Sequence, residues 1–133
     1  MAATSFSKDK INDQIFGDVA ITVPASYFLG LSSTQISSSG SNATEPSGAS
    51  YARVEISNDK TSFRYSSSGC ILNAIAISFP QTSGSWGTMV CAGLWDASTS
   101  GSVWFYQALP SSLIVQNNTT ISFSSSSLAF TLT

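Results

Sequence analysis

The sequence predicts an all-β protein: an antiparallel β-sandwich, jelly-roll-like, preceded by a short helix. Short segments that alternate apolar and polar residues recur along the chain, and turn-forming residues separate them at regular spacing. The chain contains 29 Ser and 12 Thr, which suits strands that need a polar outward face. Its 133 residues fit one domain. We therefore expect an N-terminal arm over residues 1–17 and a single sandwich domain over residues 18–133.

The N-terminal segment predicts one short helix over Ser7–Gly17. Ser7 is suited to cap the first turn, because its side-chain oxygen can accept a bond from a free backbone N–H. Ile11, Ile15 and Phe16 recur at helical spacing and share one face. A helix this short persists only when it packs against something. We therefore expect the arm to contact another protein subunit.

The rest of the chain is predicted to form eight or nine strands. Ala52, Val54 and Ile56 alternate with other residues, which is typical of a strand with one buried face. Pro110 is expected to end a strand, because it lacks the N–H that the ladder uses. The polar tract Ser37–Gly48 is expected to be a long exposed loop. The expected strands are Ser26–Ser32, Ser50–Ser57, Ser62–Tyr65, Asn73–Phe79, Trp86–Trp95, Val103–Leu109, Leu113–Gln116, Thr120–Phe123 and Leu128–Leu132.

The charge pattern narrows the range of partners. Five Lys and Arg stand against seven Asp and Glu, for a formal net charge of −2. The five cations are scattered, whereas a nucleic-acid binder gathers such residues against phosphate. The longest apolar segments are too short to cross a membrane, and residues 1–10 are too polar for a secretory signal. We therefore expect neither a nucleic acid nor a membrane as partner.

Residues suited to catalysis or metal binding are scarce. The chain has no His, so the usual Ser-His-Asp arrangement is not available. Glycoside hydrolysis needs paired carboxylates, and only Glu55 and Asp96 lie in or beside expected strands. Asp96 is better explained as the residue that holds the turn Asp96–Gly101. We expect no enzymatic activity, no cofactor and no metal.

Cys70 and Cys91 are the two cysteines of the chain. We interpret them as small core residues in neighbouring strands. A disulfide between them stays an open alternative, because it requires a close and well-aligned approach of their Cβ atoms. A zinc site is not expected from two Cys and no His.

Three Trp residues have two interpretations. Trp86, Trp95 and Trp104 either fill the core of the sandwich, which we favour, or present an exposed ring that stacks on a sugar. Trp104, Phe105 and Tyr106 are consecutive, so the alternation of a strand cannot turn all three inward. At least one of these three is expected at a surface.

Arg53 and Tyr51 share one face of an expected strand. Either Arg53 contacts a partner, or it forms an internal pair with Glu55 or Asp96. The internal pair is slightly favoured, since Arg suits fixed bidentate pairing. The candidate interface residues are Ile11, Ile15, Phe16, Tyr51, Arg53, Trp95, Trp104 and Tyr106.

Several short motifs follow one another in a set order. They are Tyr51-Ala52-Arg53, Phe79-Pro80, Trp86-Gly87-Thr88 and Gly93-Leu94-Trp95-Asp96-Ala97. From about Ile11 to Leu132, this succession resembles a family of small structural proteins of tailed bacteriophages, labelled tail-fibre-like or minor head proteins. Two features depart from the family pattern. Trp95 stands where Phe or Tyr is more frequent, and the C-terminal third is richer in Ser.

The resemblance implies a virion component without enzymatic activity. We expect first a capsid decoration (cement) protein, which binds the outer shell and stabilises contacts between major capsid subunits. Its partners are then the major capsid protein and sister subunits, in a homo-oligomer that we guess to be a trimer. The alternative is a tail, neck or baseplate fibre component involved in host attachment. Both predict a protein made in the bacterial cytoplasm and located on the virion, with the capsid surface favoured.

Overall fold

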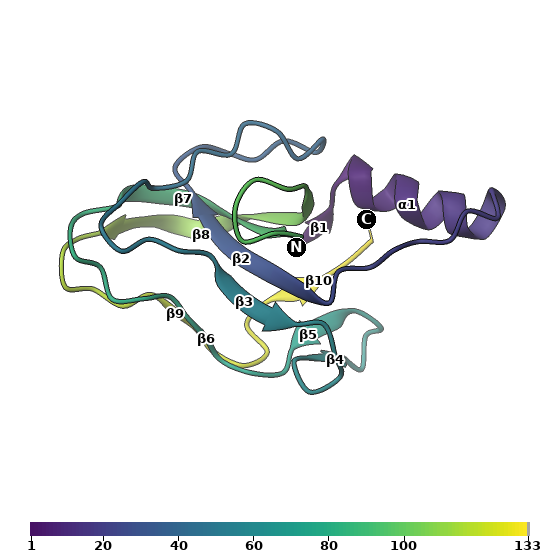
Figure 1. Cartoon of the computed structure of the whole chain (residues 1–133). Helices are drawn as coiled ribbons and strands as arrows, with labels where there is room; N and C mark the ends of the chain where they lie inside the picture. Colours follow the sequence, from purple (N-terminus) through teal and green to yellow (C-terminus); the bar gives the residue numbers. More distant parts are fainter. Residues whose placement is uncertain (133) are drawn as a thin grey trace.

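Two long antiparallel strands, β7 (Gly87–Trp95) and β8 (Val103–Val115), form the centre of this computed structural model, which describes residues 1–132. On one side, β2 (Ser26–Ser32) pairs with β7, and β3 (Val54–Ser57) pairs with β2. On the other side, β1 (Ala2–Ala3) pairs with β8. The result is a five-stranded antiparallel sheet with the order β1-β8-β7-β2-β3 (Figure 1).

Two smaller antiparallel sheets form a second layer (Figure 1). One has the order β10-β5-β4, and the other pairs β6 with β9. Their strands are β4 (Phe63–Tyr65), β5 (Ile71–Asn73), β6 (Ile77–Ser78), β9 (Ser122–Phe123) and β10 (Ala129–Phe130). The predicted all-β, sandwich-like class is therefore confirmed. A jelly roll arranges eight strands as two Greek keys. The strand orders of this chain do not establish that arrangement, so the predicted jelly-roll connectivity is not confirmed.

The main core lies between the two layers. Leu29 and Leu31 from β2 and Leu94 from β7 are buried there with Phe63 and Phe130 from the smaller sheets. In β2 and β7 these residues alternate with neighbours on the opposite face of the sheet, which are themselves buried or half-buried. The rings of Phe63 and Phe130 meet edge to face, with 5.6 Å between their centroids. Burial of each such side chain stabilises the fold by roughly 1.5–3 kcal/mol.

The opposite face of the five-stranded sheet is covered in part by the connection between β2 and β3. Ile36 of this connection packs against Cys91, Trp95 and Val103 in a second, smaller core. The tract Ser37–Gly48, which follows Ile36, is mostly exposed, as predicted. A buried anchor at its start nevertheless holds the connection on the sheet.

The helix α1 (Ser5–Phe16) begins two residues earlier than predicted. Thr4, rather than Ser7, is the N-cap, and its side-chain oxygen accepts a bond from the backbone N–H of Ser7 at 3.4 Å. Ser7 is buried instead, and its hydroxyl donates to the carbonyl oxygen of Trp104 at 2.8 Å. Gly17 follows the last helical residue, as predicted. Within residues 1–132, no helix combines the length and the apolar character needed to span a membrane.

Residues 73–79 do not form the single strand that alternation predicts. β5 ends at Asn73, and β6 begins at Ile77. The buried side chain of Asn73 donates to the carbonyl oxygen of Ile75 at 2.9 Å, which replaces ladder bonds by a local bend. Ile75 is consequently exposed, whereas Ile77 is buried.

The expectation that Pro110 ends a strand is wrong, because β8 continues past it. The pairing register shifts at this point: Cys91 faces Ala108, and Met89 faces Leu113. Pro110 therefore lies in a bulge, where its missing N–H removes no ladder bond. The strands expected on either side of Pro110 are one strand.

The strand expected over Ser50–Ser57 begins only at Val54. Ala49 and Ser50 have positive φ angles of 51° and 65°, which are incompatible with a continuing strand. The chain turns there before it enters β3.

Candidate assembly surfaces

Residues 2–3 of the expected arm pair in the large sheet as β1, so the name arm is used from this point for residues 5–25. It consists of α1 and the segment that returns to β2. Its base is anchored on β8. The Thr4 hydroxyl donates to the carbonyl oxygen of Val103 at 2.6 Å, and the rings of Phe6 and Trp104 meet edge to face with 5.4 Å between centroids. The far half of the helix leaves the sheets and projects away from them (Figure 1).

The returning segment is bonded to the helix. The carbonyl oxygen of Asp13 accepts bonds from the N–H groups of Gly17 and Val19, at 2.9 and 3.1 Å. The side-chain oxygen of Gln14 accepts a bond from the N–H of Ile21 at 2.8 Å. The helix and the returning segment therefore project as one unit.

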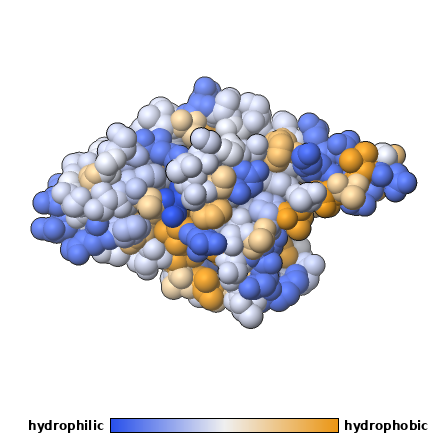
Figure 2. Space-filling view, in the orientation of Figure 1, coloured by the Kyte–Doolittle hydropathy of each residue, from blue (hydrophilic) through white to orange (hydrophobic). Residues whose placement is uncertain are grey.

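Four exposed apolar side chains of the arm are called the apolar tip here: Ile15, Phe16 and Val19 near its outer end, and Val23 on the segment that returns to β2. The exposed fractions of the first two are 64% and 85%, and Val19 and Val23 are more than half exposed. Figure 2 shows this hydrophobic surface at the projecting end of the molecule. Clustered exposed apolar side chains are typical of protein contact surfaces. Two predicted interface residues, Ile15 and Phe16, lie in this tip, whereas Ile11 is half-buried.

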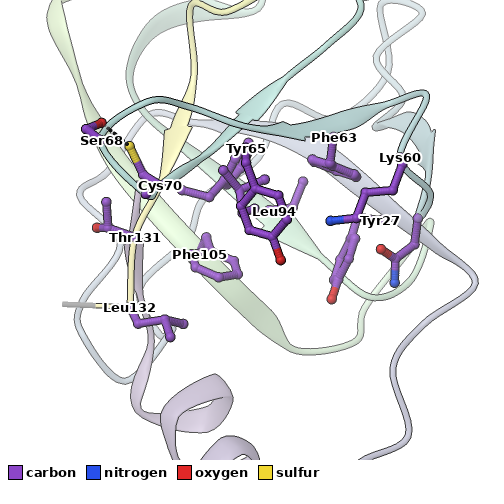
Figure 3. A pocket seen from close by; sticks show the side chains of 14 residues that line it. Tyr27, Lys60, Phe63, Tyr65, Ser68, Cys70, Leu94, Phe105, Thr131 and Leu132 are labelled. Atoms are coloured by element: carbon purple, nitrogen blue, oxygen red, sulfur yellow. Dashed lines mark hydrogen bonds between the residues drawn. The ribbon is translucent and has the colours of Figure 1, made fainter.

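A second apolar surface is a pocket of about 640 Å³ between the two layers of the sandwich. β2, β7 and β8 line one side, and the sheet of β4, β5 and β10 lines the other (Figure 3). Leu94 and Phe105 belong to its inner wall, and Lys60, Tyr65 and Leu132 also line it. Tyr65 and Leu132 are both exposed. The Lys60 ammonium lies 4.0 Å from the centre of the Tyr65 ring.

Tyr27 connects this pocket to the base of the arm. Its ring meets the rings of Phe63 and Trp104 edge to face, at centroid distances of 6.1 and 5.8 Å. Burial raises the pKa of Tyr27 to about 12, and the negative charge of Asp96 contributes in the same direction. The phenol therefore stays protonated at neutral pH.

Cys70 also lines the pocket, in the segment that leads into β5. The hydroxyl oxygens of Ser66 and Ser68 lie 3.2 and 3.3 Å from its sulfur, and their hydrogen bonds lower the pKa of the thiol. Cys91 is fully buried in β7, and both thiols are free. The prediction of two core cysteines in neighbouring strands is therefore wrong for Cys70.

Three predicted interface residues, Tyr51, Arg53 and Trp95, meet in one cluster with Glu45, which we call the polar clasp. The Arg53 guanidinium donates to both carboxylate oxygens of Glu45, at 2.9 and 2.7 Å. The Tyr51 hydroxyl donates to Glu45 Oε1 at 2.7 Å. Burial, followed by this hydrogen bond, raises the pKa of Tyr51.

The polar clasp is internal to the chain. The Arg53 side chain is 5% exposed, and its guanidinium lies 4.2 Å from the centre of the Trp95 ring. Arg53 thus has the internal pairing that we favoured, but its partner is Glu45 rather than Glu55 or Asp96. The clasp fixes the β2–β3 connection to the outer face of the large sheet.

All three Trp side chains are buried. The core interpretation holds for Trp86, which lies in the main core, whereas Trp95 lies in the smaller core and Trp104 packs between Phe6 and Tyr27. The indole N–H of Trp104 donates to Asp96 at 3.1 Å. Asp96 also accepts a bond from the backbone N–H of Ser102 at 2.8 Å, so it holds the turn as expected. Tyr106 is half-buried beside the smaller core. The interface candidates therefore separate into an exposed tip and a buried or half-buried group.

Sequence reasoning missed Glu45 and the pocket. Glu45 is the sole acidic residue between Asp18 and Glu55, and this isolation was a usable signal for a partner of Arg53. The pocket gave no local signal, because its lining comes from segments far apart in the sequence. Within residues 1–132, no group of three or more His, Cys, Asp or Glu side chains is arranged to hold a metal ion.

Comparison with known proteins identifies the family. No curated protein sequence matches the chain. The sequence model of one family, described as podophage GP4 fiber I protein gp80, matches residues 2–131. The match spans the arm and the sandwich, and it agrees with the resemblance to structural proteins of tailed phages. The chain therefore belongs to the podophage GP4 fiber I protein gp80 family and is a structural protein of a phage virion.

Proposed function

We propose that the protein is a non-enzymatic subunit of a phage fibre, joined to neighbouring protein subunits through its arm. The observation that carries this proposal is the apolar tip. Phe16 is 85% exposed at the end of a projecting, internally bonded segment. Leaving such a surface in water is unfavourable, whereas its burial against a neighbour stabilises an assembly.

The arm combines a firm base with an exposed end. Thr4 and Ser7 hold the base on β8 by hydrogen bonds to the carbonyl oxygens of Val103 and Trp104. A neighbour that binds the tip is thereby coupled to the large sheet rather than to a loose tail. Repeated contacts of this kind strengthen a multi-subunit particle through effective concentration.

A capsid decoration protein is the second candidate. Only 9% of the residues are charged, so a contact with the shell would rest on shape and hydrogen bonds rather than on salt-sensitive pairs. In this case the arm binds the major capsid protein. The description of the family as a fiber protein favours the first candidate.

Copy number in purified virions distinguishes the two candidates. The protein is quantified against the major capsid protein by mass spectrometry with isotope-labelled reference peptides. A fibre subunit is expected at a few per cent of the shell subunit. A number comparable with that of the shell subunit contradicts the fibre role and supports decoration.

Incorporation of an arm variant tests the role of the apolar tip. Phe16→Ser, in the full-length protein expressed during infection, is expected to reduce incorporation into virions while the purified variant keeps its circular dichroism spectrum. Asp9→Ser is the matched control, because Asp9 is exposed near the base of the same helix. Normal incorporation of the Phe16 variant would contradict the proposed use of the tip.

A fibre subunit can build the fibre without itself binding a host glycan, so the two roles are tested separately. A Trp-based sugar site needs an open ring face, and the side chain of Trp95 is covered by Arg53. We therefore propose a building role for this chain and no stacking of sugars on its Trp residues. Binding on a glycan array that is lost on Trp→Phe substitution would contradict this part of the proposal.

A further inference from the structure

Two apolar surfaces of this chain lack a cover within residues 1–132. One is convex, the apolar tip of the arm, and the other is concave, the pocket between the two layers. We propose that the tip of one copy enters the pocket of a second copy. This inference deepens the proposed function, because it names the partner of the arm as a sister subunit.

The pocket has the size and chemistry to receive apolar side chains. Its volume of about 640 Å³ is within the roughly 300–1,000 Å³ of pockets that enclose drug-sized ligands. Phe63, Leu94 and Phe105 line it (Figure 3). Insertion of Phe16 removes apolar surface from water on both partners, and aromatic rings in such pockets pair favourably edge to face.

Charges near the two surfaces are complementary. Asp13 and Asp18 flank the tip in sequence, and both are exposed. Lys60 lines the pocket, whereas Arg64 lies on the opposite face of β4 from Phe63 and Tyr65 and donates to Ser126. Arg53–Glu45 is the one salt bridge within residues 1–132, so Asp13, Asp18 and Lys60 have no ion-pair partner among these residues. Of the two lysines of the arm, Lys8 lies in the first turn of α1, and the ammonium of Lys10, in the middle of the helix, lies 5.5 Å from the centre of the Phe6 ring near the base.

The arm is held away from its own body. A helix of 12 residues is about 18 Å long, and its base is fixed on β8 by Thr4 and Ser7. The bond from Ile21 to Gln14 keeps the returning segment against the helix. The tip is thus presented outward, where a second copy can receive it.

The contact joins different patches on the two partners, so it is heterologous. Each copy donates one tip and accepts another. Such a contact closes into a ring when its rotation divides a full turn, and it otherwise extends as a filament. A three-membered ring is the form that agrees with the guessed trimer.

Disulfide trapping tests the contact, because Cys70 supplies a native thiol at the pocket. Val19→Cys combined with Cys70→Ser gives a chain with a thiol in the tip and none at the pocket. It is mixed with isotope-labelled wild-type chain under mild oxidation. Cys91 does not interfere, since it is fully buried.

The expected result is a mixed dimer in which mass spectrometry finds residue 19 of one copy linked to Cys70 of the other. Asp9→Cys with Cys70→Ser is the matched control, and it is expected to give no link because residue 9 lies at the base of the arm. Absence of the 19–70 link overturns the proposal. In the single variant Val19→Cys, a link confined to one chain overturns it as well, because the tip then occupies its own pocket.

Light scattering of the purified full chain gives an independent readout. The wild type is expected to associate, and Phe16→Ser is expected to raise the dissociation constant about tenfold or more. Lys60→Glu is expected to weaken association, and the double variant Lys60→Glu with Asp18→Lys is expected to restore it. A monomeric wild type, or association unchanged by Phe16→Ser, overturns the proposal. Either result leaves the virion copy number, which tests the fibre role, unaffected.

Discussion

The guanidinium of Arg53 lies 4.2 Å from the centre of the Trp95 ring, on the side of the large sheet opposite the main core. The same guanidinium donates to the carbonyl oxygens of Ala97 and Ser100, at 2.6 and 2.8 Å, as well as to Glu45. One side chain therefore connects the β2–β3 connection to the turn between β7 and β8. Both loops depend on it for their position.

Removal of Arg53 is expected to destabilise the fold. Arg53→Ala leaves the carboxylate of Glu45 and two carbonyl oxygens without their donor, and we expect a loss of about 3 kcal/mol in the free energy of unfolding. Urea unfolding followed by Trp fluorescence measures it. Arg53→Lys keeps the charge but not the bidentate geometry, so we expect its free energy of unfolding to lie between those of the wild type and Arg53→Ala. A loss below about 0.5 kcal/mol for Arg53→Ala, which is typical of a surface site, would contradict this structural role of Arg53.

Two glycines make room for the Trp95 ring. Gly93 pairs directly with Gly30 across β7 and β2, and a Cβ on Gly93 would lie 2.7 Å from Trp95 Cζ3. We expect Gly93→Ala to lower the free energy of unfolding by about 1–3 kcal/mol through overpacking. Gly84→Ala is the control, since its Cβ meets only Ala49, at 3.2 Å. Equal stability of the Gly93 variant and the wild type would show that the ring can move aside.

Local patterns predict some elements well. The bounds of Ser26–Ser32 agree with β2, an apolar segment that follows Pro24 and has paired neighbours on both sides. The helix is also predicted, since helical spacing is a local property, but its N-cap is Thr4 rather than the predicted Ser7. Local patterns mislead at two residues. The side chain of Asn73 bonds to the backbone and bends the chain where alternation predicts one strand. Pro110 was expected to end a strand, but it lies in a bulge of β8, and the strand continues.

The candidate surfaces, too, can be predicted from the sequence only where they depend on local patterns. Ile15 and Phe16 are contact candidates in the sequence because helical spacing places them on one face of a short helix. The pocket depends on which strands face each other, and no single segment encodes that arrangement. The partner of Arg53 was missed for a similar reason, since Glu45 lies in a tract with no periodicity, and its place on the sheet depends on the buried anchor Ile36.

Asn73 joins β5 to the segment that leads into β10. Its side chain donates to the carbonyl oxygens of Ile75 and Ser124 and accepts from the N–H of Leu128, each at 2.9 Å. Asn73→Ala removes three hydrogen bonds, each worth about 1 kcal/mol, and leaves the N–H of the buried Leu128 without its acceptor, so we expect a loss of about 3 kcal/mol in the free energy of unfolding. The exposed Asn58, whose side chain donates to a single carbonyl, is the control. Similar losses for Asn73→Ala and Asn58→Ala would contradict the special role of Asn73.

Tyr27 is expected to make stability fall at high pH. Its pKa is about 12 in the folded chain and has an ordinary value of 10.0. The folded state therefore holds the proton more tightly, so the contribution of Tyr27 is fully present below about pH 10 and is lost as pH rises toward 12. Urea unfolding of the wild type and of Tyr27→Phe is compared between pH 8 and 11.

The Phe variant is the control for this pH dependence, because it has no phenolic proton and keeps the ring contacts with Phe63 and Trp104. Tyr51, whose pKa is also raised, contributes equally to both proteins, so only their difference is used. We expect the stability of the wild type to fall more steeply than that of the variant above pH 10. Parallel curves would mean that Tyr27 reaches water as freely in the folded chain as in the unfolded one.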